Sequence, residues 1–281
     1  MFPAKSRRLG LYLMAMSVAL LATAGPGLAF ADGGHEDHGD RGVYIALGDS
    51  LAVGTGASTP AHLGYVAWIH RATIPGHTTL ANLSRGGETS ASMLVAGGQL
   101  DQALAAIAAP SDVEVVTLDI GGDDLLPLLG SEPCASDPAG DPCRGVIAAQ
   151  LAGFNANFPT ILGTIQAALA ADPGDEAFAV MTYYNPFSGA GSPFEAPVDG
   201  ALFGLDGVID CAALGNPQNA GLNDLIACTA GALGVTVVDV YPTFAGRGAQ
   251  LTHILENDVH PNNRGHRVIG RAFIQTLGLR G

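Results

Sequence analysis

The chain has 281 residues, of which 48% are hydrophobic and 14% charged, which suits one globular domain with a large core, although the length permits two. Its formal net charge of -14 argues against a nucleic-acid partner, because phosphate binding needs clustered Lys and Arg side chains. The same negative charge disfavours adsorption to an anionic lipid surface.

The first residues have the pattern of a secretory signal peptide. A positively charged start is followed by an apolar run at 11–24 and by a small-x-small cleavage site, Ala29-Phe30-Ala31. The run is too short and wrongly flanked for a spanning helix, so we predict a signal peptide at 1–31, secretion and no stable membrane insertion. The alternative is an uncleaved membrane anchor.

Apolar segments of strand length alternate with helical patterns through the rest of the chain. A polar, glycine-rich leader is predicted at 32–41, and one domain at 42–281, because we find no repeat or domain linker. Strands are predicted at 43–47, 78–83, 113–118, 176–183 and 235–240. Helices are predicted at 64–71, 90–109, 145–171, 201–233 (in two pieces) and 262–277, and loops at 131–144, 185–197 and most of 241–259.

This alternation predicts an α/β fold with a mostly parallel sheet that is covered by helices on both faces. Ligands of such sheets bind beyond the carboxyl ends of the strands. Ser50, Gly87 and Asp123 each follow a predicted strand, so we expect them at one edge of the sheet. His260 precedes the last predicted helix and can reach the same edge.

Four cysteines in a chain that is expected to be secreted indicate disulfides. Among the three possible connectivities we prefer pairing of neighbours, Cys134 with Cys143 and Cys211 with Cys228. Loop entropy suggests that the second bridge would stabilise the fold by about 3 kcal/mol. A zinc site is the alternative, although the chain lacks a C-x-x-C pair.

Ser50 stands in the motif Gly48-Asp49-Ser50-Leu51, at a predicted turn from strand to helix. A serine in this place exposes its hydroxyl, and its backbone N–H lies near a helix N-terminus, where it can bind a developing oxyanion. Alone, this short motif is better explained by a helix N-cap.

His260 lies just before Pro261, at the start of the last predicted helix. A histidine can take a proton from a serine and return it to a leaving group, although a surface histidine is the simpler explanation. The competing bases have no comparable context; they are His62, His70, His77, His253 and His266.

Two glycine-rich turns can complete a site around Ser50. Gly87 follows the second predicted strand, where its N–H can approach a ligand, and Asp123 follows two glycines after the third strand. Alone, each is explained as a turn or a helix cap.

Together these pieces, in this order over about 220 positions, resemble the SGNH (GDSL-type) hydrolases. The resemblance implies a flavodoxin-like three-layer α/β/α sandwich with a mostly parallel five-stranded sheet. It also implies ester hydrolysis without a metal or other cofactor. Ser50 would be the nucleophile and His260 the base, and the N–H groups of Ser50 and Gly87 and a side chain at position 123 would form the oxyanion hole.

Two positions depart from the family pattern. Asp123 replaces the usual asparagine, and the loss of one oxyanion donor costs about 10²–10³ in rate. Asn257 replaces the usual aspartate three residues before the histidine, a change that can cost about 10⁴. We expect Asp258 or a backbone carbonyl to orient His260 instead; Asp123 is a third possibility.

The sequence thus predicts a secreted, monomeric esterase or lipase for small-molecule or lipid esters. Its pocket would be lined by Asn185-Pro186-Phe187, Phe194 and the loop ahead of Asn257, which favours an acyl chain or an aryl ester. The alternatives are a carbohydrate deacetylase and a low-turnover secreted binding protein on the same fold.

Overall fold

The computed structural model describes residues 42–73, 78–109, 112–171, 174, 176–204, 207–215 and 219–279. All of these residues belong to one compact unit. Several predictions fall outside the described residues: the signal peptide at 1–31, the leader at 32–41, His77, and most of the helix break at 215–217.

The secondary-structure elements follow one another in the predicted alternation. The strands are β1 (Gly42–Gly48), β2 (Thr78–Asn82), β3 (Val113–Asp119), β4 (Ala177–Met181), β5 (Thr236–Val238), β6 (Thr252–His253) and β7 (Asp258–Pro261). The α-helices are α1 (Ser50–Val53), α2 (Pro60–Leu63), α3 (Tyr65–Ala72), α4 (Ser90–Met93), α5 (Gln99–Ile107), α6 (Gly122–Leu129), α7 (Asp141–Leu169), α8 (Glu195–Phe203), α9 (Leu222–Leu233), α10 (Tyr241–Phe244), α11 (Gly248–Leu251) and α12 (Asn263–Thr276). Short 3-10 helices are η1 (Cys211–Gly215) and η2 (Ile254–Glu256).

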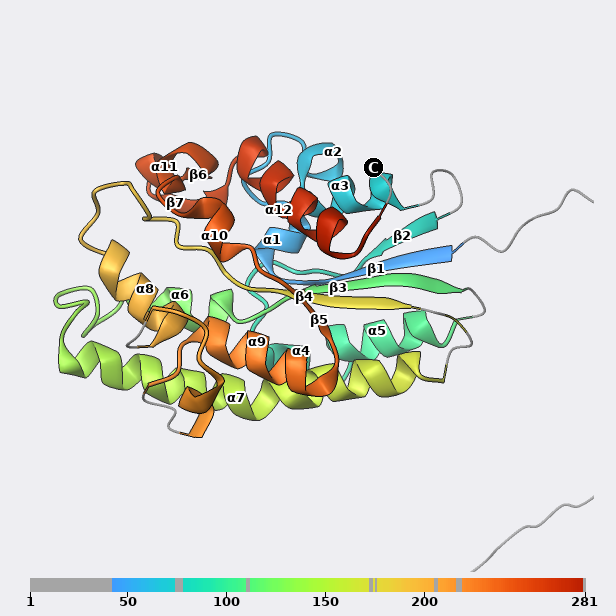
Figure 1. The fold of residues 1–281 in the computed structure, drawn as a ribbon, viewed down its shortest axis with the longest axis horizontal. Coiled ribbons are helices and arrows are strands. Elements are labelled where there is room, and N and C mark those ends of the chain that lie inside the picture. Colours follow the sequence, from blue (N-terminus) through green and yellow to red (C-terminus); the bar gives the residue numbers. More distant parts are fainter. Residues whose placement is uncertain are drawn as a thin grey trace, which may run out of the picture. The chain divides into compact units, whose positions relative to one another are not determined.

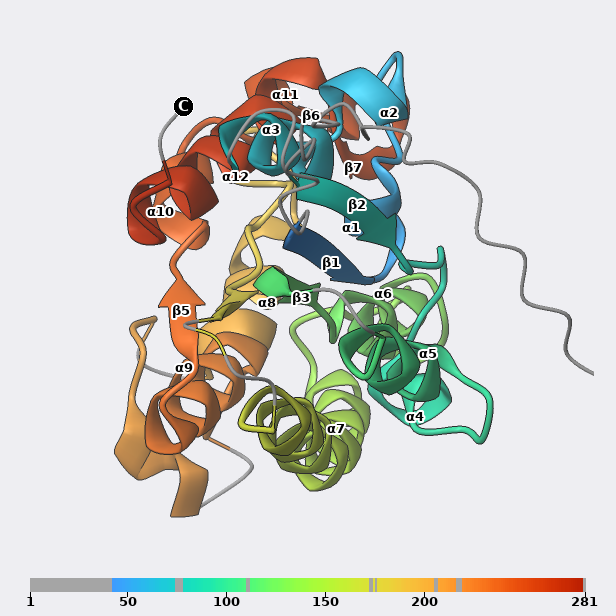
Figure 2. The same cartoon turned by 90° about the vertical axis from the view of Figure 1, so that its right-hand side faces the viewer.

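The first five strands form one parallel sheet in the order β2-β1-β3-β4-β5. The continuous apolar run of β1 and the mostly apolar β3 are buried in the middle of this sheet, as expected for strands covered on both faces. The helices α3 and α12 cover one face, while α5, α7 and α9 cover the other (Figures 1 and 2). The predicted three-layer sandwich with a five-stranded parallel sheet is confirmed.

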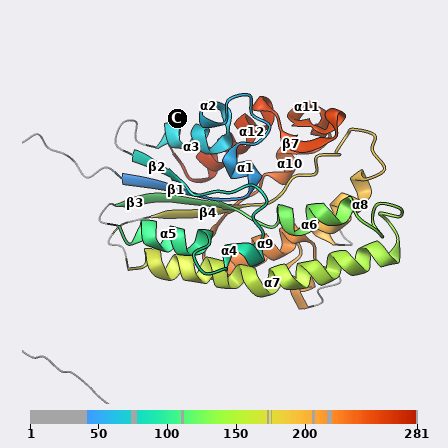
Figure 3. The same cartoon turned by 180° about the vertical axis from the view of Figure 1, so that it is seen from behind.

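Close packing of helices on the sheet is achieved with small residues and regular apolar spacing. On α12, the buried residues His266, Ile269, Gly270 and Phe273 recur at helical intervals. A Cβ at Gly270 would lie 2.6 Å from the Cβ of Trp68, so glycine allows α12 to approach α3. Seen from behind, the sandwich has α3 and α12 on one side of the sheet and the long α7 on the other (Figure 3).

The structure differs from the sequence prediction mainly in the connections. Helix α7 begins at Asp141, inside the predicted loop at 131–144, because Pro142 suits the first turn of a helix. The predicted helix at 90–109 is split into α4 and α5 around the turn at Gly97. The predicted loop at 241–259 contains α10, α11 and the antiparallel pair β6-β7.

In the structure, Cys134 is bonded to Cys143 and Cys211 to Cys228. The first bridge holds the loop before α7 onto the first turn of that helix, and the second connects η1 to α9. Within the described part of the chain, no helix is long and apolar enough to cross a membrane.

Candidate active site

The turn between β1 and α1 presents Ser50 at the carboxyl edge of the sheet. Gly48 has φ 138°, and a Cβ there would lie 2.4 Å from the carbonyl oxygen of Asp119, so the turn requires glycine. The Gly48 N–H donates to Gln99 Oε1 at 2.5 Å, and Gln99 Nε2 donates back to the Gly48 carbonyl at 2.9 Å. Gln99 therefore fixes the peptide that precedes the candidate nucleophile.

Asp49 caps helix α1 directly before Ser50. Its Oδ1 accepts the Leu51 N–H at 2.8 Å, and its Oδ2 accepts the Tyr183 hydroxyl at 2.6 Å. The Ser50 N–H is one of the first backbone groups of α1, which have no acceptor within their own helix. This N–H is therefore well placed to bind a negatively charged oxygen beside the serine hydroxyl.

Ser50, His260 and Asp258 form a connected chain of side chains. His260 Nε2 lies 2.8 Å from Ser50 Oγ, and His260 Nδ1 lies 2.5 Å from Asp258 Oδ1. When Nδ1–H donates to Asp258, Nε2 is left as the acceptor for the serine proton. The geometry thus brings together the three groups that proton transfer from a serine requires.

The strand β7 explains why an acid two residues before the histidine can reach it. Alternate side chains of a strand point to the same face, so Asp258 and His260 lie side by side. The Asp258 Oδ1 also accepts the His260 backbone N–H at 3.0 Å. Burial alone would raise the pKa of Asp258, but the hydrogen bonds from the His260 backbone and ring outweigh it and leave this pKa lowered.

Asn257 has a different place in the hairpin. It is exposed, has φ 62° and ends the short helix η2, a left-handed position that asparagine tolerates well. The next strand is held by the Tyr184 hydroxyl, which donates to the Val259 carbonyl at 3.0 Å. The turn at Asn257 thus directs β7 so that Asp258 lies next to the imidazole.

Asp123 comes from the first turn of α6, which follows β3. The start of α6 lies close to Tyr183 and Asp49, since a Cβ at Gly122 would lie 2.6 Å from the Tyr183 ring and 3.1 Å from Asp49 Oδ2. Asp123 is partly buried, and its Oδ2 is a buried atom that has no hydrogen-bond partner among the residues that the structure describes. Burial and then the neighbouring Asp49 raise the pKa of Asp123 to about 6, although His260 and the Gly87 backbone N–H act in the opposite direction.

We expect Asp123→Asn to raise the rate of ester hydrolysis at alkaline pH. Below its pKa of about 6 the Asp123 carboxyl is protonated and can donate to an oxyanion; above it the carboxylate repels one. The ratio of mutant to wild-type kcat/KM should therefore increase through this pH and reach about 10². Initial rates from acidic to alkaline pH measure the ratio, and a ratio that does not vary with pH would contradict the idea.

Gly87 is exposed and has φ 78°, in a segment that passes close to Ser50: a Cβ added at Gly86 would lie 3.9 Å from Ser50 Cβ. Asp124, which sequence analysis gave no role of its own, anchors this segment. Its buried carboxylate accepts the N–H and the hydroxyl of Ser90, at 2.9 and 2.6 Å. Two adjacent aspartates therefore differ in role: one faces the site and the other holds the loop that carries Gly87.

A buried pair of carboxyl groups, Asp49 and Asp119, lies beneath the serine, and sequence analysis missed it. The Asp49 N–H donates to Asp119 Oδ2 at 3.1 Å, and the Tyr65 hydroxyl donates to Asp119 Oδ1. Burial and then the Asp49 charge raise the pKa of Asp119 well above its ordinary value, so Asp119 holds the proton that the pair shares. An aspartate that directly follows an apolar strand is a signal that could have indicated such a pair.

The raised pKa of Asp119 predicts that stability falls with increasing pH. Between the unfolded pKa of about 4 and the higher folded pKa, the folded state binds more protons, so the free energy of unfolding decreases as pH rises. Asp119→Asn cannot titrate and should show a smaller decrease. Denaturant unfolding at several pH values measures both slopes, with the exposed Asp141→Asn as control; equal slopes would show that the pair is not responsible.

The other described histidines do not contact Ser50. His266 is buried, donates to the Thr55 carbonyl and accepts the Tyr65 N–H, and burial lowers its pKa to about 4. His253 lies between the Gly56 carbonyl and Glu256. His70 lies 3.0 Å from the Thr78 carbonyl. These three histidines bond to groups other than Ser50, which distinguishes them from His260.

A mostly apolar pocket with a volume of about 70 Å³ opens beside Ser50 and His260. Pro186 and Phe187 line it as predicted, but Asn185 is buried and holds the loop instead, and Phe194 packs on Phe187. Eight of the 18 residues that line it come from helices that sequence analysis did not assign to the pocket. These residues are Leu125, Leu126 and Leu129 of α6, Ile147 of α7, Val198, Ala201 and Leu202 of α8, and Leu222 of α9.

The parallel sandwich and the polar groups at its carboxyl edge agree with a comparison of the sequence with protein families. The chain belongs to the GDSL-like Lipase/Acylhydrolase family, whose model matches residues 46–268. This match confirms the resemblance seen in the sequence and supports an ester hydrolase as the class of protein. Among curated proteins, no sequence matches the chain.

Solved structures of similar fold include lipases and an esterase. The lipase Lip_vut3 from a goat rumen metagenome has 20% identity and a TM-score of 0.58, covering 84% of this chain and 97% of its own. An extracellular lipase from Streptomyces rimosus has 21% identity and a TM-score of 0.54, covering 84% and 98%. A catalytic mutant of an acetylxylan esterase from Geobacillus stearothermophilus has 15% identity and a TM-score of 0.56, covering 86% and 96%. These likenesses concern the fold.

Proposed function

We propose that the chain is a secreted serine hydrolase that cleaves carboxylic esters with an apolar acyl group. The observation that carries this proposal is the contact of 2.8 Å between Ser50 Oγ and His260 Nε2, with Asp258 on the other ring nitrogen. Membership of the GDSL-like Lipase/Acylhydrolase family supports the reaction class.

In the proposed mechanism, Ser50 Oγ attacks the ester carbonyl carbon while His260 Nε2 takes the hydroxyl proton. The N–H groups of Ser50 and Gly87 stabilise the tetrahedral oxyanion, joined by Asp123 when its carboxyl is protonated. His260 then gives the proton to the leaving alcohol. Water attacks the acyl-enzyme while His260 takes its proton, and His260 then gives this proton to Ser50 Oγ as the carboxylic acid is released. No metal or other cofactor takes part.

The lining of the pocket supports an acyl chain or an aryl group more than an acetylated sugar. Its walls are mainly leucine, isoleucine, valine and aromatic side chains, which bind hydrocarbon and offer few hydrogen bonds to a carbohydrate. A small-molecule or lipid ester is therefore the proposed substrate.

The remaining parts of the proposal concern processing, domain organisation and oligomeric state. We propose that the signal peptide at 1–31 is removed, that 32–41 is a leader, and that 42–281 acts as a single catalytic domain in a monomer. Two disulfides agree with an oxidising compartment.

Labelling with an alkyl p-nitrophenyl phosphonate tests the nucleophile directly. The expected result is one adduct per chain by intact mass, mapped to Ser50 by peptide sequencing, together with turnover of p-nitrophenyl butyrate. An adduct on another residue would contradict the assigned nucleophile. Absence of both labelling and turnover would favour the binding protein, and turnover of acetylated xylo-oligosaccharides alone would favour the deacetylase.

A further inference from the structure

A second cavity, of about 240 Å³, lies behind the wall of the pocket beside Ser50. Ile147 of α7 and Ala201 of α8 line both spaces, so these two side chains form the partition between them. The second cavity is the larger of the two. It is also separated from the polar groups of the site, since Ser50, His260 and Asp49 line the first pocket alone.

The walls of the second cavity are mostly apolar. Helix α7 contributes Ala148 and Leu151 beside Ile147, and α8 contributes a face of small residues beside Ala201. Among the described residues, Arg144 is the one charged side chain of the lining. Figure 1 shows α8 lying beside the first part of α7, with α6 next to them, beyond the carboxyl ends of the strands. Such a space suits a hydrocarbon chain better than a polar ligand.

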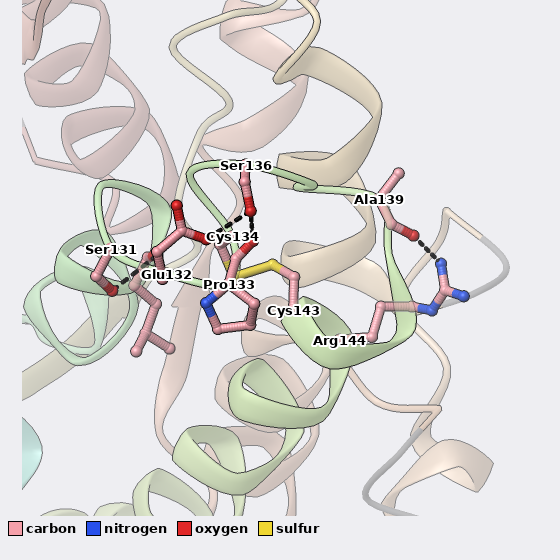
Figure 4. The surroundings of a disulfide bond; sticks show 9 residues. Ser131, Glu132, Pro133, Cys134, Ser136, Ala139, Cys143 and Arg144 are labelled. Atoms are coloured by element: carbon pink, nitrogen blue, oxygen red, sulfur yellow. Dashed lines mark hydrogen bonds between the residues drawn. A yellow bond between two sulfur atoms is a disulfide. The ribbon is translucent and has the colours of Figure 1, made fainter.

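The loop that closes the rim of this cavity is held in place covalently. Pro138 and Ala139 belong to the loop between Cys134 and Cys143, and both cysteines are buried (Figure 4). Arg144 donates to the Ala139 carbonyl and pairs with Asp141 (the first of these contacts is drawn in Figure 4). Since the Arg144 side chain is 58% exposed, this polar group marks where the cavity meets solvent.

We propose that the second cavity binds the distal part of a long, unbranched acyl chain whose ester carbonyl lies at Ser50. The inference rests on the proposed function and extends it, because it names the substrate class as esters of long fatty acids. The chain passes between Ile147 and Ala201, and the bulk of these two side chains limits the acyl length that the enzyme accepts. The disulfide-bonded loop supplies the far wall.

Two matched variants of α7 test this proposal. Ala148 lines only the second cavity, whereas the adjacent Ala149 is exposed. Ala148→Leu fills the cavity and should lower the ratio of kcat/KM for p-nitrophenyl laurate to that for p-nitrophenyl butyrate by about tenfold. Ala149→Leu makes the same change on the solvent side of the helix and should leave the ratio as in the wild type.

A substitution in the partition between the two cavities should have the opposite effect on the laurate-to-butyrate ratio. Ile147→Ala widens the passage and should raise the same ratio of laurate to butyrate turnover by several-fold. If Ala148→Leu lowers both activities equally, or neither, the second cavity does not bind the acyl chain, and the proposed ester hydrolysis still stands. If the wild type hydrolyses neither ester, the proposed function fails, and the inference fails with it.

Discussion

Replacing Ser50 by alanine should lower kcat for ester hydrolysis by about 10⁶. The serine oxygen is the proposed nucleophile, and it lies 2.8 Å from Nε2 of His260, the proposed base. The fold should not change, because the helix cap at this turn is made by Asp49 and the preceding peptide is held by Gln99. KM should change little, since the apolar pocket is left intact.

The measurement is steady-state hydrolysis of p-nitrophenyl butyrate by purified wild type and variant. Ser84→Ala is the matched control, because Ser84 also follows a strand at the carboxyl edge, and its hydroxyl bonds only to the Asn82 side chain among the contacts of the described residues. This control should keep wild-type kcat. Activity of Ser50→Ala within about tenfold of the wild type would show that another group is the nucleophile, since a lost nucleophile costs far more.

Asp258→Asn should lower kcat by about 10⁴, the second largest effect. Asp258 Oδ1 accepts from both the ring Nδ1–H and the backbone N–H of His260, at 2.5 and 3.0 Å. An amide at this position can present its NH₂ group to the ring, which favours the tautomer with the proton on the wrong nitrogen. The imidazole then cannot accept the proton of Ser50.

Asn257→Asp is the matched control for this prediction. It places an acid at the position where the family usually has one, but on an exposed, left-handed turn of this chain. We expect at most a few-fold change in kcat, because Asp258 already orients the imidazole. If Asn257→Asp raised kcat strongly, or rescued Asp258→Asn, position 257 would be the true site of the orienting acid.

The results for Ser50→Ala and Asp258→Asn distinguish an active hydrolase from a low-turnover binding protein. Asn257 alone suggested a missing acid, and Asp123 a missing oxyanion donor. The contact between Asp258 and His260 supports a working base, and the pKa of about 6 confines the effect of Asp123 to a range of pH. The low-turnover binding protein would require that both Ser50→Ala and Asp258→Asn leave the activity unchanged.

The sequence by itself determined the sheet and the positions along the chain at which its site residues occur. The continuous apolar run at 43–47 and the mostly apolar segment at 113–118 have the length and composition of strands covered on both faces, so the pattern predicted parallel strands. The Gly-Asp-Ser-Leu turn and the family spacing then placed Ser50, Gly87, Asp123 and His260 at one edge. These features can be recognised from residue types and their spacing along the chain.

The tertiary structure decided what depends on segments far apart in the sequence. The acid beside His260 could not be chosen from spacing alone, because Asp258 reaches the ring only when β6 and β7 pair and Asn257 turns left-handed between them. Asp49 and Asp119 share a proton because folding buries the ends of two strands next to each other. The pocket and the second cavity lie between α7 and α8, with α6 beside the pocket alone, and no sequence period predicts the space that remains between packed helices.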